Sequence, residues 1–102
     1  MTNKIVNTSN WSICTITSIK NQIKNSNYIV HYDFIIDQQV ISNSDGIDLT
    51  SIDNINKLKG RKALVLYLKS DIFQNRIIIT DYQIKKYNIS PPDSLKHLII
   101  MQ

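Results

Sequence analysis

The chain has 102 residues, of which 42% are hydrophobic and 20% charged, with only two Gly and two Pro. This composition excludes a disordered tail, and the length leaves room for one domain with a single core. The formal net charge of +4 permits weak attraction to nucleic acid or to an anionic membrane.

The only cysteine, Cys14, cannot form an internal disulfide, so an oxidising compartment is not implied. No apolar run approaches the roughly 20 residues that a membrane-spanning helix needs. The first residues contain no apolar signal-peptide core. We therefore expect a cytoplasmic protein without a membrane partner, folded as one domain over residues 1–102, with residues 1–10 flexible.

In the first half of the chain, residues 11–20 and 28–37 are predicted to form strands. The first alternates Trp11 and Ile19 on one face with Cys14 and Ile16 on the other. The second has a regular period of two, which predicts that one row of its side chains points inward. That row consists of Tyr28, Val30, Tyr32, Phe34 and Ile36.

A tight connection at residues 37–39 leads into a short predicted strand at residues 40–43. Residues 44–50 are predicted to form a loop that turns at Asp45-Gly46, a common turn dipeptide. Residues 50–59 are predicted to form a short helix capped by Thr50 and Asp53, with Gly60 as its left-handed stop.

Residues 61–69 and 76–80 are predicted to form two strands joined by a polar turn at residues 70–75. The first of them has apolar residues on both faces, which predicts a strand that is covered on both sides and lies at the centre of the sheet. Residues 81–87 are predicted to form a helical turn that ends at Asn88. For residues 93–102, a terminal helix and a final strand remain open.

These elements predict a mainly β fold. We expect a small antiparallel barrel or sandwich of five strands, of SH3 or OB type, with one or two short helices.

Part of the pattern resembles an uncharacterised bacterial family of small β domains, across residues 12–80. The likeness rests on a strand of the TxxSI type, a YxxxYxFxxDG hairpin and a GxxVxVxY strand. The chain departs from it at Gln38, Lys69 and Phe73, where the family has Gly or Pro, and it lacks the membrane segment that many members carry. The resemblance implies a fold and no catalytic residue. The matching positions are Thr15, Ile16, Thr17, Ser18, Ile19, Tyr28, Tyr32–Asp37, Gly60, Val65, Tyr67 and Ile77.

Two groups of residues contain side chains of the kinds that catalysis or metal binding needs. Cys14 and His31 lie on neighbouring predicted strands, so a Cys–His nucleophile pair is conceivable, although a lone cysteine is usually a small buried hydrophobe. His31, Asp33 and Asp37 share a strand face but form no known metal motif. We therefore expect neither a catalytic site nor a metal or other cofactor.

The function that we expect is a small, non-enzymatic binding or accessory module with a protein partner, in an oligomeric state that the sequence leaves open. The alternative is a barrel that binds single-stranded nucleic acid by stacking bases on tyrosines beside basic residues. An enzyme that uses Cys14 and His31 is the third possibility. The residues of the nucleic-acid alternative are Arg61, Lys62, Tyr67, Tyr82, Lys85, Lys86 and Tyr87.

Overall fold

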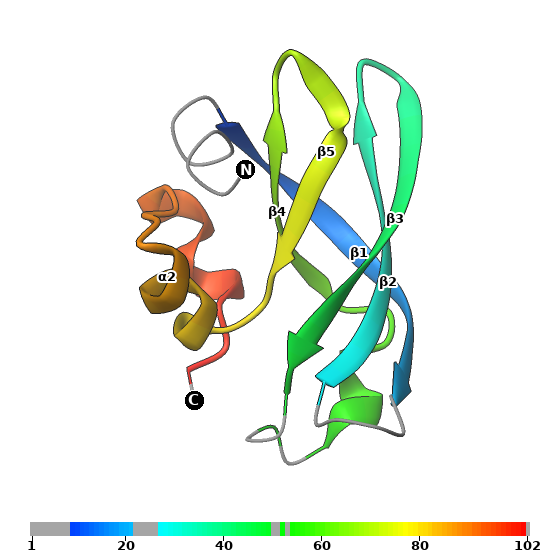
Figure 1. Cartoon of the computed structure of the whole chain (residues 1–102), viewed down its shortest axis with the longest axis vertical. Helices are drawn as coiled ribbons and strands as arrows, with labels where there is room; N and C mark the ends of the chain where they lie inside the picture. The colour runs from blue at the N-terminus through cyan, green and yellow to red at the C-terminus, as the bar shows by residue number, and fades with distance from the viewer. Residues whose placement is uncertain (1–8, 22–26, 50–51, 53, 102) are drawn as a thin grey trace.

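The computed structural model describes residues 9–21, 27–49, 52 and 54–101, so most of the segment predicted to be flexible lies outside the described residues. The described fold is mainly β, with one short α-helix and two 3-10 turns (Figure 1). In chain order the elements are β1 (Ser9–Asn21), β2 (Asn27–Ile36), β3 (Gln39–Asp48), η1 (Ile55–Leu58), β4 (Lys62–Leu68), β5 (Asp71–Ile78), α2 (Asp81–Tyr87) and η2 (Asp93–Leu98).

The five strands form one antiparallel sheet in the order β3-β2-β1-β4-β5. The first four strands make a Greek key, in which a long connection returns β4 to the side of β1. The sheet curls until β3 lies beside β5, which gives a nearly closed barrel of the kind that OB folds use. The predicted fold class is confirmed, but the middle strand is β1 and not β4.

Because all neighbouring strands are antiparallel, the β2–β3 and β4–β5 turns lie at the same end of the barrel (Figure 1). We call this the hairpin end. The end of β1, the start of β2 and η1 lie at the opposite end.

Strand β2 has the predicted alternation. Val30, Tyr32 and Phe34 are buried in the barrel core, and Tyr28 and Ile36 pack against the same core. The turn that follows has positive φ at both central residues, 50° at Asp37 and 66° at Gln38. This is the conformation of a two-residue type I′ hairpin.

Strand β3 corrects the prediction of a loop at residues 44–50. It pairs with β2 without interruption from Gln39 to Asp48, and Gly46 lies within this ladder opposite Ile29. The turn preference of Asp45-Gly46 is local, and the continuous pairing outweighs it.

Strand β1 contains a β-bulge, which corrects the prediction that Trp11 and Ile19 share a face. The pairing register with β2 shifts between Ile16 and Ser18. The extra residue, Thr17, reverses the alternation beyond it. Ile19 therefore packs against the barrel core with Cys14 and Ile16, whereas Trp11 packs on the outside.

Strand β4 is covered on both sides, as predicted. Ala63 and Val65 belong to the barrel core, while Leu64 and Leu66 belong to a second apolar cluster on the outside. Residues of α2 and η2 pack against this second cluster, on the left in Figure 1.

The turn between β4 and β5 is tighter than predicted. It consists of Lys69 and Ser70, and β5 begins at Asp71. A register shift opposite Tyr67 and Leu68 accommodates the polar residues that follow. The Asp71 carboxylate accepts hydrogen bonds from the Phe73 N–H and the Gln74 amide, so these residues form a bulge inside the strand.

Only one 3-10 turn, η1, is found in the described part of the predicted helix at residues 50–59. Thr50 and Asp53, its predicted cap, lie outside the described residues. Ile52, Ile55 and Leu58 still pack against the barrel core, as their spacing predicts. Gly60 has a φ of 83°, which confirms the left-handed stop.

Helix α2 has the predicted bounds and ends at Asn88 in the left-handed conformation. It begins with a capping box between Thr80 and Gln83. The buried Gln83 amide also donates to the Ile77 carbonyl and accepts from the Ile79 N–H. Both alternatives for the C-terminal segment hold in part, because η2 is followed by a single parallel bridge from Ile100 to Thr80.

Side chains join β3 to β5, the two end strands of the sheet. The Asn75 side-chain oxygen accepts hydrogen bonds from the Tyr32 hydroxyl (2.5 Å) and the Asn43 amide (2.8 Å). One step further along, the Asp45 carboxylate lies 3.8 Å from the Arg76 guanidinium. We call these five residues the polar seam.

The β2–β3 turn predicts a stabilising substitution. Gln38→Gly should raise the free energy of unfolding by about 0.5–1 kcal/mol, since glycine adopts positive φ without steric cost. Urea denaturation measures the change. Gln39→Gly is the matched control in extended backbone and should lower stability, so destabilisation by Gln38→Gly would contradict the turn assignment.

The polar seam predicts a pH dependence. Burial raises the pKa of the Asp45 carboxyl above its ordinary value of 3.8, although the Arg76 guanidinium opposes the shift. The folded protein therefore binds this proton more readily than the unfolded chain. The stability that the group contributes is greatest below pH 3.8 and is lost as the pH rises through its folded-state pKa.

Urea denaturation of wild type and Asp45→Asn across the acidic range isolates this effect. The stability of wild type minus that of the variant should fall as the pH rises, because Asn does not titrate. A difference that grows with pH would mean that pairing with Arg76 dominates over burial.

Candidate functional site

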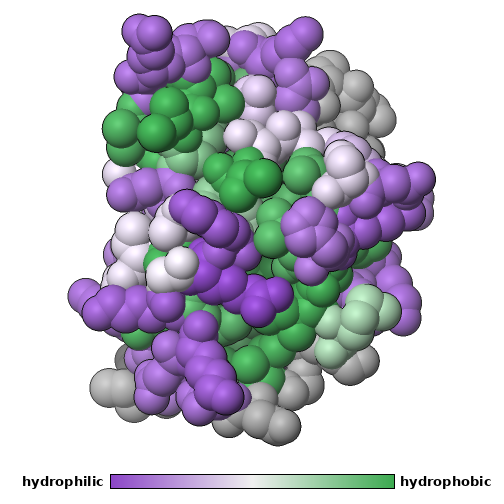
Figure 2. All heavy atoms as spheres, turned by 180° about the vertical axis from the view of Figure 1, so that it is seen from behind, coloured by the Kyte–Doolittle hydropathy of each residue, from purple (hydrophilic) through white to green (hydrophobic). Residues whose placement is uncertain are grey.

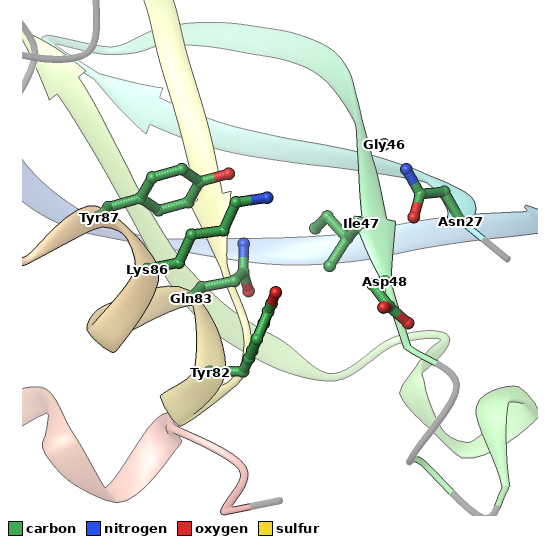
Figure 3. Close-up of a pocket in the computed structure, with 8 residues that line it drawn as sticks. All are labelled: Asn27, Gly46, Ile47, Asp48, Tyr82, Gln83, Lys86 and Tyr87. Carbon is green, nitrogen blue, oxygen red and sulfur yellow. The ribbon is translucent and has the colours of Figure 1, made fainter.

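A small pocket lies between α2 and the end of β3, on the side of the barrel that contains the polar seam (Figure 3). Its volume is about 130 Å³. Tyr82, Lys86 and Tyr87 extend from α2 on one side, and the Gly46–Asp48 segment of β3 forms the other. The complete lining is Asn27, Gly46, Ile47, Asp48, Tyr82, Gln83, Lys86 and Tyr87.

The contacts of α2 with β5 determine how the α2 side chains that line the pocket are oriented. Gln83 ties the first turn of the helix to the end of β5, which directs Tyr82 and Lys86 toward β3. The Arg76 guanidinium lies 4.5 Å from the centroid of the Tyr87 ring, and the Lys86 ammonium lies 5.7 Å from it. Two cations therefore flank one aromatic ring at the edge of the pocket.

The structure brings together some of the residues proposed for nucleic-acid binding and separates others. Tyr82, Lys86 and Tyr87 line the pocket. Lys85 is on the same helix but pairs with Asp81 at 4.0 Å and does not line the pocket.

The remaining three lie elsewhere. Tyr67 is partly buried and packs against the barrel core, with its ring centroid 6.0 Å from that of Phe34. Arg61 and Lys62 are exposed at the start of β4, where the Lys62 ammonium donates to the Thr15 hydroxyl. Tyr67 is therefore not available for stacking, because β4 turns this side chain inward.

Sequence reasoning missed the other half of the pocket. The sequence predicts a loop at Gly46 and Asp48, and it carries no signal that pairs Arg76 with Tyr87. Only Gln83 had a recognisable sequence signature, the Thr-x-x-Gln capping box.

Cys14 and His31 are not brought together. Cys14 is buried in the barrel core, where its thiol faces the Leu64 carbonyl at 3.8 Å. His31 lies between the buried Val30 and Tyr32 on β2, so its side chain points to the outer face. The pair on which the enzyme hypothesis depended is separated by the sheet itself.

The row of possible metal ligands on β2 does not form a cluster. Among the residues that the structure describes, no group of three or more His, Cys, Asp or Glu side chains could hold a metal ion. The described part of the chain also contains no helix long and apolar enough to cross a membrane.

Exposed apolar side chains gather at the hairpin end. Ile35 and Val40 are directly paired across β2 and β3 and are 64% and 61% exposed, and Phe73 on β5 is 63% exposed. Figure 2 shows the molecule from the opposite side. At the upper left of that view, apolar side chains cover part of the β2–β3 hairpin, next to hydrophilic ones. We call Ile35, Val40 and Phe73 the apolar tip.

Acidic and basic residues are distributed unevenly along the chain. Residues 27–56 contain five Asp and neither Lys nor Arg, whereas residues 57–102 contain nine Lys or Arg and three Asp. Four of the five Asp lie on the β2–β3 hairpin, the part of the barrel through which OB folds bind oligonucleotides.

Comparison with known proteins gives no relative: the chain matches no protein-family model, no curated protein and no solved structure.

The buried thiol gives a testable expectation. Burial raises the pKa of Cys14 from 9.0 to about 12. Because the thiolate is the reactive form, Cys14 should react slowly with iodoacetamide in the folded protein and rapidly in urea. Mass spectrometry of the alkylated protein measures both rates. Rapid modification of the folded protein near neutral pH would contradict this placement and reopen nucleophilic chemistry at Cys14.

Proposed function

We propose that this chain is a small, non-enzymatic binding module that docks a protein partner at its hairpin end. The apolar tip is the observation that carries the proposal, because its three side chains are each more than 60% exposed and lie on neighbouring strands at one end of the barrel. Interfaces typically have an apolar centre with a polar rim.

The charge of the rim indicates what kind of surface the partner presents. Asp33 and Asp37 lie beside Ile35 on the β2–β3 hairpin, and Asp71 lies at the start of β5, next to Lys69. Acidic side chains therefore predominate around the tip. A partner with apolar side chains set among Lys or Arg is complementary to it, since opposite charges steer association and exclude wrong partners.

Nucleic acid is a weaker candidate than a protein as the partner of the outer barrel surface. The Asp residues of the β2–β3 hairpin repel a phosphate backbone, and Tyr67 packs against the core. The proposal includes a cytoplasmic location, which the single unpaired cysteine supports.

Affinity capture from cells that express the chain naturally tests the proposal. Wild type should retain a specific protein, and Ile35→Ser/Phe73→Ser should bind that protein, once purified, at least about tenfold more weakly, as expected for hot-spot residues. Met101→Ser is the matched control, because Met101 is 76% exposed but lies in the C-terminal segment outside the apolar tip.

Two results would contradict the proposal. One is that no protein is retained by wild type. The other is equal affinity of the purified partner for wild type and for Ile35→Ser/Phe73→Ser, with Met101→Ser as the reference for a neutral surface change.

A further inference from the structure

The pocket between α2 and β3 lies away from the hairpin end and has a different chemistry. Its α2 wall carries two phenol rings and one ammonium group, from Tyr82, Lys86 and Tyr87. Its β3 wall includes the backbone of Gly46 and the Ile47 side chain. A ligand that fits both walls has a flat ring and a negative charge.

Tyr82 supplies a surface for a flat ring. Its side chain is 50% exposed at the edge of the pocket, although it lies on a helix that is otherwise anchored through the buried Gln83. Gly46 has no side chain on the opposite wall, and the space beside it is open, because a Cβ atom built there would meet nothing within 4 Å. A planar group can therefore approach Tyr82 from the β3 side without displacing a side chain at Gly46.

Lys86 and Arg76 supply positive charge next to this surface. Both lie close to the Tyr87 ring, at 5.7 Å and 4.5 Å from its centroid. Arg76 is held at 3.8 Å from Asp45, so Lys86 is the cation that lines the pocket itself. A phosphate is favoured next to Lys86 and away from Asp48, and the uncharged ring fits between Tyr82 and the β3 wall.

We propose that this pocket binds one nucleotide, with the base stacked on Tyr82 and the phosphate near Lys86. The shared chemistry is that of a nucleoside monophosphate, either free or as one residue of a single strand. Base stacking on aromatic side chains and phosphate attraction to Lys are the two interactions that this combination provides. The site is independent of the apolar tip, so either can fail without the other.

A titration followed by NMR shifts of the backbone amides tests the proposal. The probes are adenosine, guanosine, cytidine and uridine monophosphates, the corresponding nucleosides, inorganic phosphate, and single-stranded RNA of six nucleotides. Binding of a monophosphate identifies a free nucleotide as the ligand, and binding of the RNA alone identifies a single strand. Binding of either ligand should shift the backbone amide resonances of residues 46–48 and 82–87.

Neighbouring residues of α2 provide the matched variants. Lys86→Ala should weaken binding several-fold, whereas Lys85→Ala removes the same charge from outside the pocket and should change it little at physiological salt. Tyr82→Ala should weaken binding roughly 5- to 150-fold, the range expected for one stacked base. Tyr82→Phe keeps the ring and should retain most of the affinity.

Three outcomes would overturn the assignment. The first is the absence of shifts at the pocket with every monophosphate and with the RNA. The second is inorganic phosphate binding as tightly as the nucleotides, since the base would then contribute nothing. The third is an equal loss of affinity in Lys85→Ala and Lys86→Ala, which would indicate attraction to the overall charge.

Discussion

The Asn75 side chain joins three strands of the barrel. Its oxygen accepts from Tyr32 on β2 and Asn43 on β3, and its amide donates to the Ile72 carbonyl in the bulge of β5. The sheet order ends at β3 and β5, so the meeting of these two strands depends on such side-chain contacts. The Tyr32 hydroxyl belongs to a residue that is only 1% exposed, and it needs this acceptor because an unpaired buried hydroxyl is costly.

The polar seam also determines where the two candidate surfaces lie. By holding β3 against β5, it brings Gly46–Asp48 close to α2, which follows β5 directly and is anchored to it by Gln83. The antiparallel pairing places the β2–β3 and β4–β5 turns at one end, and the polar seam holds β3 and β5 together there, where Ile35, Val40 and Phe73 are exposed. The polar seam thus holds together the strands that form the pocket and the strands that carry the apolar tip.

The sequence was informative where local pattern and long-range pairing agree. In β2 the period of two coincides with one buried face, and in α2 the cap, the length and the Asn88 stop are all local. The sequence was misleading where strand pairing overrides the conformational preference of the local residues. Asp45-Gly46 has the composition of a turn but lies in a ladder with β2, and the bulge at Thr17 moves Ile19 to the opposite face. The local sequence of a single chain does not indicate the strand pairing at Gly46 or the bulge at Thr17.

For the pocket, the sequence indicated Tyr82, Lys86 and Tyr87 as residues of interest, because tyrosines lie beside basic residues in this segment. It could not show that Tyr67 faces the core or that α2 lies opposite β3. Those facts depend on how the barrel closes, and the polar seam that closes it is made of residues distant in sequence.

A double-mutant cycle with Tyr32→Phe and Asn75→Ala tests the central role of the polar seam most directly, with free energies of unfolding from urea denaturation. Asn75→Ala should destabilise wild type by about 1–3 kcal/mol, because it leaves the buried Tyr32 hydroxyl without its acceptor. In the Tyr32→Phe background that hydroxyl is absent, so the loss should be smaller by roughly 1 kcal/mol. Losses that agree within about 0.3–0.5 kcal/mol in the two backgrounds would contradict the account, since the two residues would then be independent.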